Sequence, residues 1–153
     1  MSSDKETKNI RVMLVIEVIG RPPEEVTNVL EKLIKQIDEE PGVSVKNKKV
    51  NEPILLKDQK NIFTSFAEIE VEVEEVRHIA GLMFKYMPAH VEILSPELIA
   101  LANDGWNDIF NELTRRLHGY DEIARVIQVE KNILENKLKA LLPEDKTNEE
   151  KKE

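Results

Sequence analysis

The sequence predicts an α+β fold, in which an antiparallel sheet carries two helices on one face and is followed by a C-terminal helical hairpin. Two observations indicate this organisation. Up to residue 94, stretches of alternating or continuous apolar residues take turns with stretches of helical periodicity. Beyond residue 95 the periodicity is helical only. The charged, non-periodic ends, residues 1–8 and 143–153, are predicted to be disordered tails.

The first half of the sheet domain, which spans residues 9–94, begins with IRVMLVIEVIG, a strand with an almost entirely apolar middle. RPPEEV then opens a helix, because proline suits the first turn and glutamates are favourable near the positive end of the helix dipole. Its apolar residues recur at helical spacing until Pro41 and Gly42 end it: Val26, Val29, Leu30, Leu33, Ile34 and Ile37. VSVKNKKV is the second strand, and a further extended piece, EPILL, follows it.

The second half repeats this order. IFTSFAEIEVEV is a long strand, EEVRHIAGLMFKYMP is a helix, and AHVEIL is the fourth strand. The resulting β-α-β-β-α-β order is the ferredoxin-like plan. Right-handed crossovers then place the predicted strands in the spatial order 4-1-3-2, with both helices on one face.

The C-terminal part, residues 95–142, is predicted to be a helical hairpin. Ser95 is a good helix cap and Pro96 suits the first helical position. The segment HGYDE breaks the helical run, with Gly119 at a left-handed cap position. The second helix has a narrow apolar stripe that is typical of a helix–helix seam. Two placements stay open: the hairpin packs on its own sheet, or it packs on another subunit.

The acidic row in the third strand, Glu68, Glu70 and Glu72, must point away from the two helices, because Ala67, Ile69 and Val71 alternate with it. If the preceding turn closes symmetrically, Lys46 lies opposite Glu70 and Lys48 lies opposite Glu68. Such cross-strand pairs stabilise a sheet and already neutralise the carboxylates. A bulge near Asn51 to Pro53 would shift this register.

The same parity gives the open face of the sheet an apolar centre. Met13, Val15 and Phe66 lie there, with Leu94 on the fourth strand. Exposed apolar patches of this kind mark contact surfaces. We therefore expect a homo-oligomer, a dimer or larger, whose contacts use these residues together with Ile127, Leu134 and Leu141 of the last helix.

A metal site is a weaker candidate on this face. His90 and Glu92 share one side of the fourth strand, and Glu17 on the neighbouring first strand would be a third ligand. The other interpretation is a half-exposed polar edge strand. No catalytic residue stands out: cysteine is absent, no Gly-x-Ser-x-Gly elbow occurs, and no glycine-rich phosphate loop is present. We expect no cofactor and lean against an enzyme.

The composition also limits which classes of partner we expect. The net charge of −8 opposes binding to nucleic-acid phosphates. The apolar runs are too short to span a membrane, and the polar start lacks a secretory signal. With no cysteine, a cytoplasmic location is the simplest expectation.

The β-α-β-β-α-β order with IGRPPEEV after the first strand resembles the ACT-type regulatory domains. This resemblance implies an amino-acid ligand bound near Gly20, Arg21 and Pro22. Pro23 stands where the family prefers glycine and offers no backbone N–H. The whole chain is also similar to small uncharacterised archaeal proteins. Three functions follow as hypotheses: a self-associating interaction or scaffold module, an ACT-like small-molecule sensor, and a metal-dependent enzyme.

Overall fold

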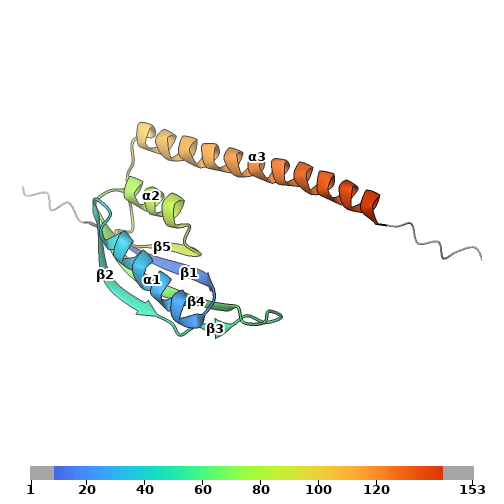
Figure 1. Ribbon diagram of the computed structural model, residues 1–153. Helices are drawn as coiled ribbons and strands as arrows, with labels where there is room; N and C mark the ends of the chain where they lie inside the picture. Colours follow the sequence, from blue (N-terminus) through green and yellow to red (C-terminus); the bar gives the residue numbers. More distant parts are fainter. Residues whose placement is uncertain (1–8, 143–153) are drawn as a thin grey trace, which may run out of the picture. The chain divides into compact units, whose positions relative to one another are not determined.

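The computed structural model describes residues 9–142, so the tails predicted at both ends lie outside the described residues. The protein has an α+β fold with a five-stranded antiparallel sheet and three helices (Figure 1). In chain order the elements are β1 (Ile10–Gly20), α1 (Pro23–Asp38), β2 (Val43–Val50), β3 (Ile54–Leu55), β4 (Phe63–Val73), α2 (Val76–Tyr86), β5 (His90–Ser95) and α3 (Asn103–Leu141).

The four longer strands lie in the order β2-β4-β1-β5, and the short β3 pairs with the start of β4. β1 and β4 are the central strands and pair over their full length, from Ile10 opposite Val73 to Gly20 opposite Phe63. Every pairing is antiparallel. β2 and β5 therefore form the two ends of this four-strand order.

One face of the sheet carries the hydrophobic core, and α1 and α2 supply the other half of it. Alternate residues of the central strands are buried there, as the sequence pattern predicts. The core residues with almost no exposure are Val12, Leu14 and Ile16 of β1, Ala67, Ile69, Val71 and Val73 of β4, Leu30, Ile34 and Ile37 of α1, and Ile79 and Leu82 of α2.

Local sequence explains where α1 and α2 begin and end. Pro22 caps α1 and Pro23 opens it, with Glu24 and Glu25 in the first turn. At the start of α2, Glu75 and His78 form a reciprocal capping box. Met87 ends this helix in the left-handed conformation.

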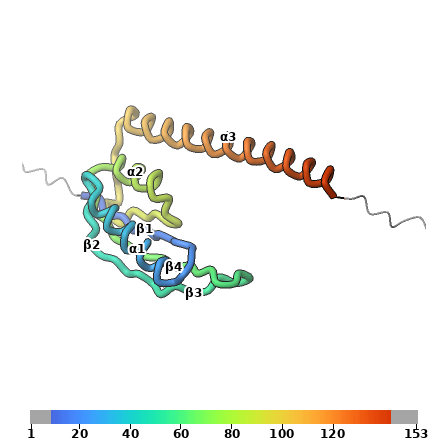
Figure 2. Tube along the Cα trace, viewed as in Figure 1, coloured from blue at the N-terminus to red at the C-terminus, as the bar shows by residue number. Residues whose placement is uncertain are grey.

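The predicted C-terminal hairpin is wrong. Residues Asn103–Leu141 form one 39-residue helix, which the trace in Figure 2 follows without interruption. Gly119 lies inside it, and a Cβ added there would meet nothing within 4 Å. A single glycine costs only about 1 kcal/mol relative to alanine. Since the apolar pattern keeps its phase on both sides of Gly119, the helix tolerates this cost and continues.

The predicted helix start at Ser95 is also wrong. Ser95 is the last residue of β5 and pairs with Arg11 of β1. The next residues take an irregular path on which Ile99 packs against the core, and helix formation is delayed until Asn103. The sheet and the core contact thus outweigh the local Ser-Pro signal.

The described chain divides into two compact units, and the division lies within α3. The N-terminal unit runs to Ile109 and contains the sheet, α1 and α2. The second unit begins at Phe110 and contains the rest of α3. Each is considered by itself below.

Candidate interaction surfaces

The sheet face opposite α1 and α2 has the mixed character that strand alternation predicts. Met13 and Val15 are partly exposed, whereas their neighbours Val12 and Leu14 are fully buried. Phe66 of β4 is 40% exposed, and Leu94 of β5 is exposed as well. Met13, Val15 and Phe66 therefore form an apolar strip at the surface of this face, whose use as a contact stays a prediction. Leu94 lies where the pairing of β5 with β1 shifts register, so strand alternation does not assign it to this face.

The predicted charge ladder beside this strip is wrong in register. Glu70 lies opposite Asn47 and Glu68 opposite Lys49, because a bulge at Lys46 shifts the pairing of β2 with β4. Lys48 consequently turns to the helical side, where its Nζ lies 2.6 Å from Oε2 of Glu31 in α1.

Cations other than the predicted ones pair with two glutamates of the acidic row. Arg11 of β1 donates from Nε and Nη2 to Oε1 of Glu70, at 2.8 and 2.6 Å. The bulged Lys46 reaches Oε2 of Glu72 at 3.7 Å. Glu70 and Glu72 thus form surface ion pairs, which is the structural role expected for them.

The proposed metal ligands do not come together. Nε2 of His90 lies 3.8 Å from Oε2 of Glu92, while Glu17 accepts a hydrogen bond from Thr64 at 3.0 Å. Among residues 9–142 no group of three or more His, Cys, Asp or Glu side chains could hold a metal ion. A pair of exposed side chains is too few for a site, because a protein site normally supplies three or four ligands.

Gly20, Arg21 and Pro22 form the connection between β1 and α1. Arg21 and Pro22 are exposed, and the Pro22 carbonyl accepts hydrogen bonds from the backbone of Glu25 at 3.1 Å and Val26 at 3.3 Å. The connection is therefore fixed at its α1 end by ordinary capping bonds. Arg21 presents an exposed cation beside the first turn of a helix.

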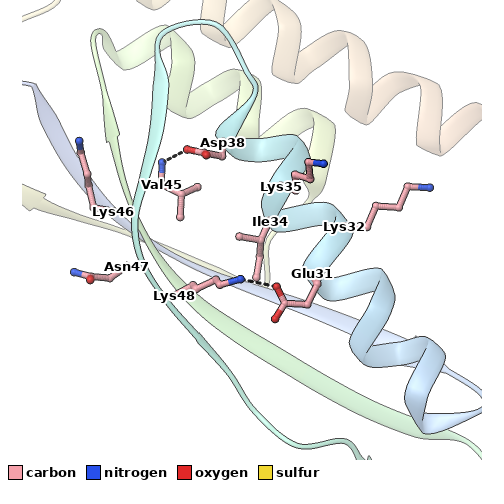
Figure 3. A pocket seen from close by; sticks show the side chains of 9 residues that line it. All are labelled: Glu31, Lys32, Ile34, Lys35, Asp38, Val45, Lys46, Asn47 and Lys48. Carbon is pink, nitrogen blue, oxygen red and sulfur yellow. Dashed lines mark hydrogen bonds and ion pairs between the residues drawn. The ribbon is translucent and has the colours of Figure 1, made fainter.

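A groove of about 650 Å³ lies between α1 and β2, and sequence reasoning did not anticipate it. Figure 3 shows its two internal links, from Lys48 to Glu31 and from the Val45 backbone N–H to Asp38 at 2.8 Å. Lys46 extends from β2 away from α1 in this view. The lysines that line the groove are spread apart and solvated, so the groove lacks the convergent groups of a binding site.

A compact polar cluster joins the end of α1 to the end of α2. Glu40 accepts a hydrogen bond from the Tyr86 hydroxyl at 2.6 Å and another from Lys85, whose ammonium lies 5.4 Å from the Tyr86 ring centre. The bond from Lys85, followed by that from Tyr86, lowers the pKa of the Glu40 carboxyl. Burial, and then the bond to Glu40, raises the pKa of Tyr86. This arrangement clamps two helix ends together.

The second unit presents an apolar stripe along α3. We define the α3 seam as the positions that follow one another at alternate spacings of three and four residues: Phe110, Leu113, Leu117, Tyr120, Ala124, Ile127, Lys131, Leu134, Leu138 and Leu141. All of them are exposed, and no residue of α3 is buried. The predicted contact residues Ile127, Leu134 and Leu141 belong to this seam.

Comparison with known protein families assigns the chain to a family. The model of the MJ0538 family matches residues 11–148, well over half of the sequence. The chain belongs to the MJ0538 family. No curated protein and no solved structure matches it.

The surfaces of this MJ0538-family chain differ in how readily its sequence reveals them. The α3 seam has a heptad signal, which our expectation of a break at Gly119 obscured. The Glu40 cluster joins residues far apart in the chain and has no local signal. Within residues 9–142, no helix is both long and apolar enough to cross a membrane.

Proposed function

We propose that this protein is a non-enzymatic, self-associating module, and that the α3 seam is its principal contact. One observation carries the proposal: a 39-residue helix has no buried residue, yet it bears an apolar stripe in heptad spacing that only one charged residue, Lys131, interrupts. Such spacing is the signature of helices that pair by inserting side chains between those of a partner.

Energetics support a partner for this helix. Most helical stability in proteins comes from packing an apolar face rather than from intrinsic propensity. Ion pairs along the second unit join Glu112 to Arg115 and Arg116, Asp121 to Arg125, and Lys131 to Glu135. Each exposed pair contributes only about 0.3–0.5 kcal/mol. Burial of one leucine side chain contributes about 1.5–3 kcal/mol, so pairing of the seam outweighs these ion pairs.

We assign the N-terminal unit to the ferredoxin-like plan. The order β2-β4-β1-β5 and the packing of α1 and α2 on one core support this assignment. The apolar strip at Met13, Val15 and Phe66 is then a second contact surface. A module of this kind would hold copies of the sheet domain together in a scaffold.

Two matched substitutions test the seam. Ile127 lies in the seam and Val129 lies on the outer side of α3, and both side chains are 57% exposed. Ile127→Asp should convert the oligomer to a monomer in light scattering, whereas Val129→Asp should leave the oligomer intact. A monomeric wild-type protein at micromolar concentration, or equal effects of the two changes, would refute the proposal.

A second candidate is an ACT-like sensor of an amino acid. The exposed Arg21 at the connection of β1 and α1 favours it, because a guanidinium binds carboxylates well. A ligand that binds only the native state raises its melting temperature. We expect such a rise with one of the amino acids and its loss in Arg21→Ala; a full amino-acid screen without any shift would exclude this candidate.

A further inference from the structure

The self-association proposed above leaves the direction of the two helices undetermined. We infer that two copies of α3 pair antiparallel, with Ala124 of each copy packed against Ile127 of the other. This inference rests on the proposed function and adds a specific geometry to it.

The sizes of the seam residues favour the antiparallel direction. In a parallel pair each seam residue meets its own counterpart, so Ala124 would face Ala124 and leave space unfilled. When the helices run in opposite directions about the midpoint between Ala124 and Ile127, each small alanine meets a large isoleucine. Close packing therefore favours the second arrangement.

The single charged residue of the seam, Lys131, also favours the antiparallel direction. In a parallel pair Lys131 would face Lys131, so two long cationic side chains would have to leave the same layer of a contact that excludes water. In the antiparallel register Lys131 of one copy lies against Tyr120 of the other. The aromatic ring can receive the cation, and the long lysine side chain can extend its charged end towards solvent.

The rest of the seam is fully paired in this register. Leu117 meets Leu134, Leu113 meets Leu138, and Phe110 meets Leu141, because each pair has the same midpoint as Ala124 and Ile127. A shift of one heptad in either direction leaves positions at one end of the seam without a seam counterpart. Complete burial of the stripe thus selects one antiparallel register.

The charged residues beside the seam slightly favour the parallel arrangement. The antiparallel register brings Arg116 near Lys137 of the second copy. A parallel pair brings Arg116 near Asp121 but also Glu130 near Glu135. These side chains stay in water, where such pairs are weak, and Arg116 already binds Glu112 at 2.6 Å. The water-excluded positions therefore decide the direction.

The direction has a consequence for a scaffold. In the antiparallel pair, the two points at which the N-terminal units join the seam lie at opposite ends. Phe110 to Leu141 spans roughly 45 Å of helix. The paired helices thus act as a spacer between two sheet domains, whereas a parallel pair would bring the two attachment points together.

The absence of cysteine from the sequence allows a direct test. Leu113→Cys and Leu138→Cys are made as separate full-length proteins, then oxidised alone and as a mixture. We expect a disulfide-linked dimer in the mixture and little or none in either protein alone. Leu117→Cys with Leu134→Cys should behave in the same way, which guards against one poorly folded variant. Val129→Cys, on the outer side of α3, is the control and should not cross-link.

The possible results separate this inference from the proposed function. Cross-linking of each single variant with itself, in a protein that light scattering shows to be oligomeric, would overturn the antiparallel direction and leave the proposed function standing. An oligomer that forms none of these disulfides would overturn pairing through the seam. A monomer without cross-links would overturn both.

Discussion

Gly42 lies directly against the imidazole ring of His78. A Cβ on Gly42 would sit 2.5 Å from Nε2 and 2.6 Å from Cε1 of this ring, and Gly42 has φ +72°. The ring is held in place because Nδ1 accepts a hydrogen bond from the Glu75 backbone at 3.2 Å. The turn after α1 and the first turn of α2 therefore meet at a position that only glycine fits.

We expect Gly42→Ala to lower the free energy of unfolding by about 1–3 kcal/mol, because the new methyl group combines left-handed strain with a steric clash. Urea unfolding measures the change. Gly81→Ala is the control: a Cβ there meets nothing within 4 Å inside α2, so this variant should be neutral or stabilised by up to about 1 kcal/mol. A Gly42→Ala protein as stable as wild type would contradict the assigned contact.

The Glu40 cluster predicts a specific loss of stability in acid. Hydrogen bonds from Lys85 and then Tyr86 lower the pKa of folded Glu40 below its ordinary value of 4.5. The cluster therefore contributes its full stabilisation above pH 4.5, and this contribution is lost as the pH falls through the folded pKa. Unfolding free energies measured from pH 6 to pH 3 should fall less steeply in Glu40→Gln than in wild type. Glu39→Gln, which removes a charge from the exposed neighbouring residue, should keep the wild-type slope.

The ion pair of Arg11 and Glu70 should show measurable coupling. Both Arg11 donors reach one oxygen of Glu70, whose side chain is only 18% exposed. A double-mutant cycle with alanine at each position should give a coupling energy of about 0.2–1 kcal/mol. The same cycle for Lys46 and Glu70 should give none, since the bulge directs Lys46 to Glu72. Coupling in the Lys46 cycle alone would restore the symmetric register.

The sequence predicted those features that depend on periodicity. Alternation placed Leu14 and Ile69 in the core and Glu70 outside it, since a strand has only two faces. The predicted register of β2 against β4 was wrong because a single bulged residue, Lys46, leaves no mark in the sequence composition. The predicted helix break at Gly119 was wrong because the prediction followed the local glycine signal and not the longer heptad pattern around it. The seam residues could be predicted from periodicity in the same way. The contact of Glu40 with Tyr86 could not, because it depends on tertiary folding.

The last prediction concerns Lys131, the one charged residue in the α3 seam. If the seam is the contact, Lys131→Leu should tighten the oligomer, because a charged group no longer has to be accommodated there. We expect its dissociation constant, measured by sedimentation over a dilution series, to fall by roughly tenfold or more, which corresponds to about 1.4 kcal/mol. Lys139→Leu, outside the seam, is the control and should leave the constant within about twofold.

The same substitution should also loosen the choice of direction. A polar residue at a core position restricts helix pairing to arrangements that tolerate it. With leucine at position 131, the parallel pair no longer has to accommodate two lysines in one layer, so both directions become accessible. Proteins that combine Lys131→Leu with Leu138→Cys should therefore begin to cross-link to themselves on oxidation. A tighter oligomer that still forms no such disulfide would mean that the packing of Ala124 against Ile127, rather than the lysine, sets the direction.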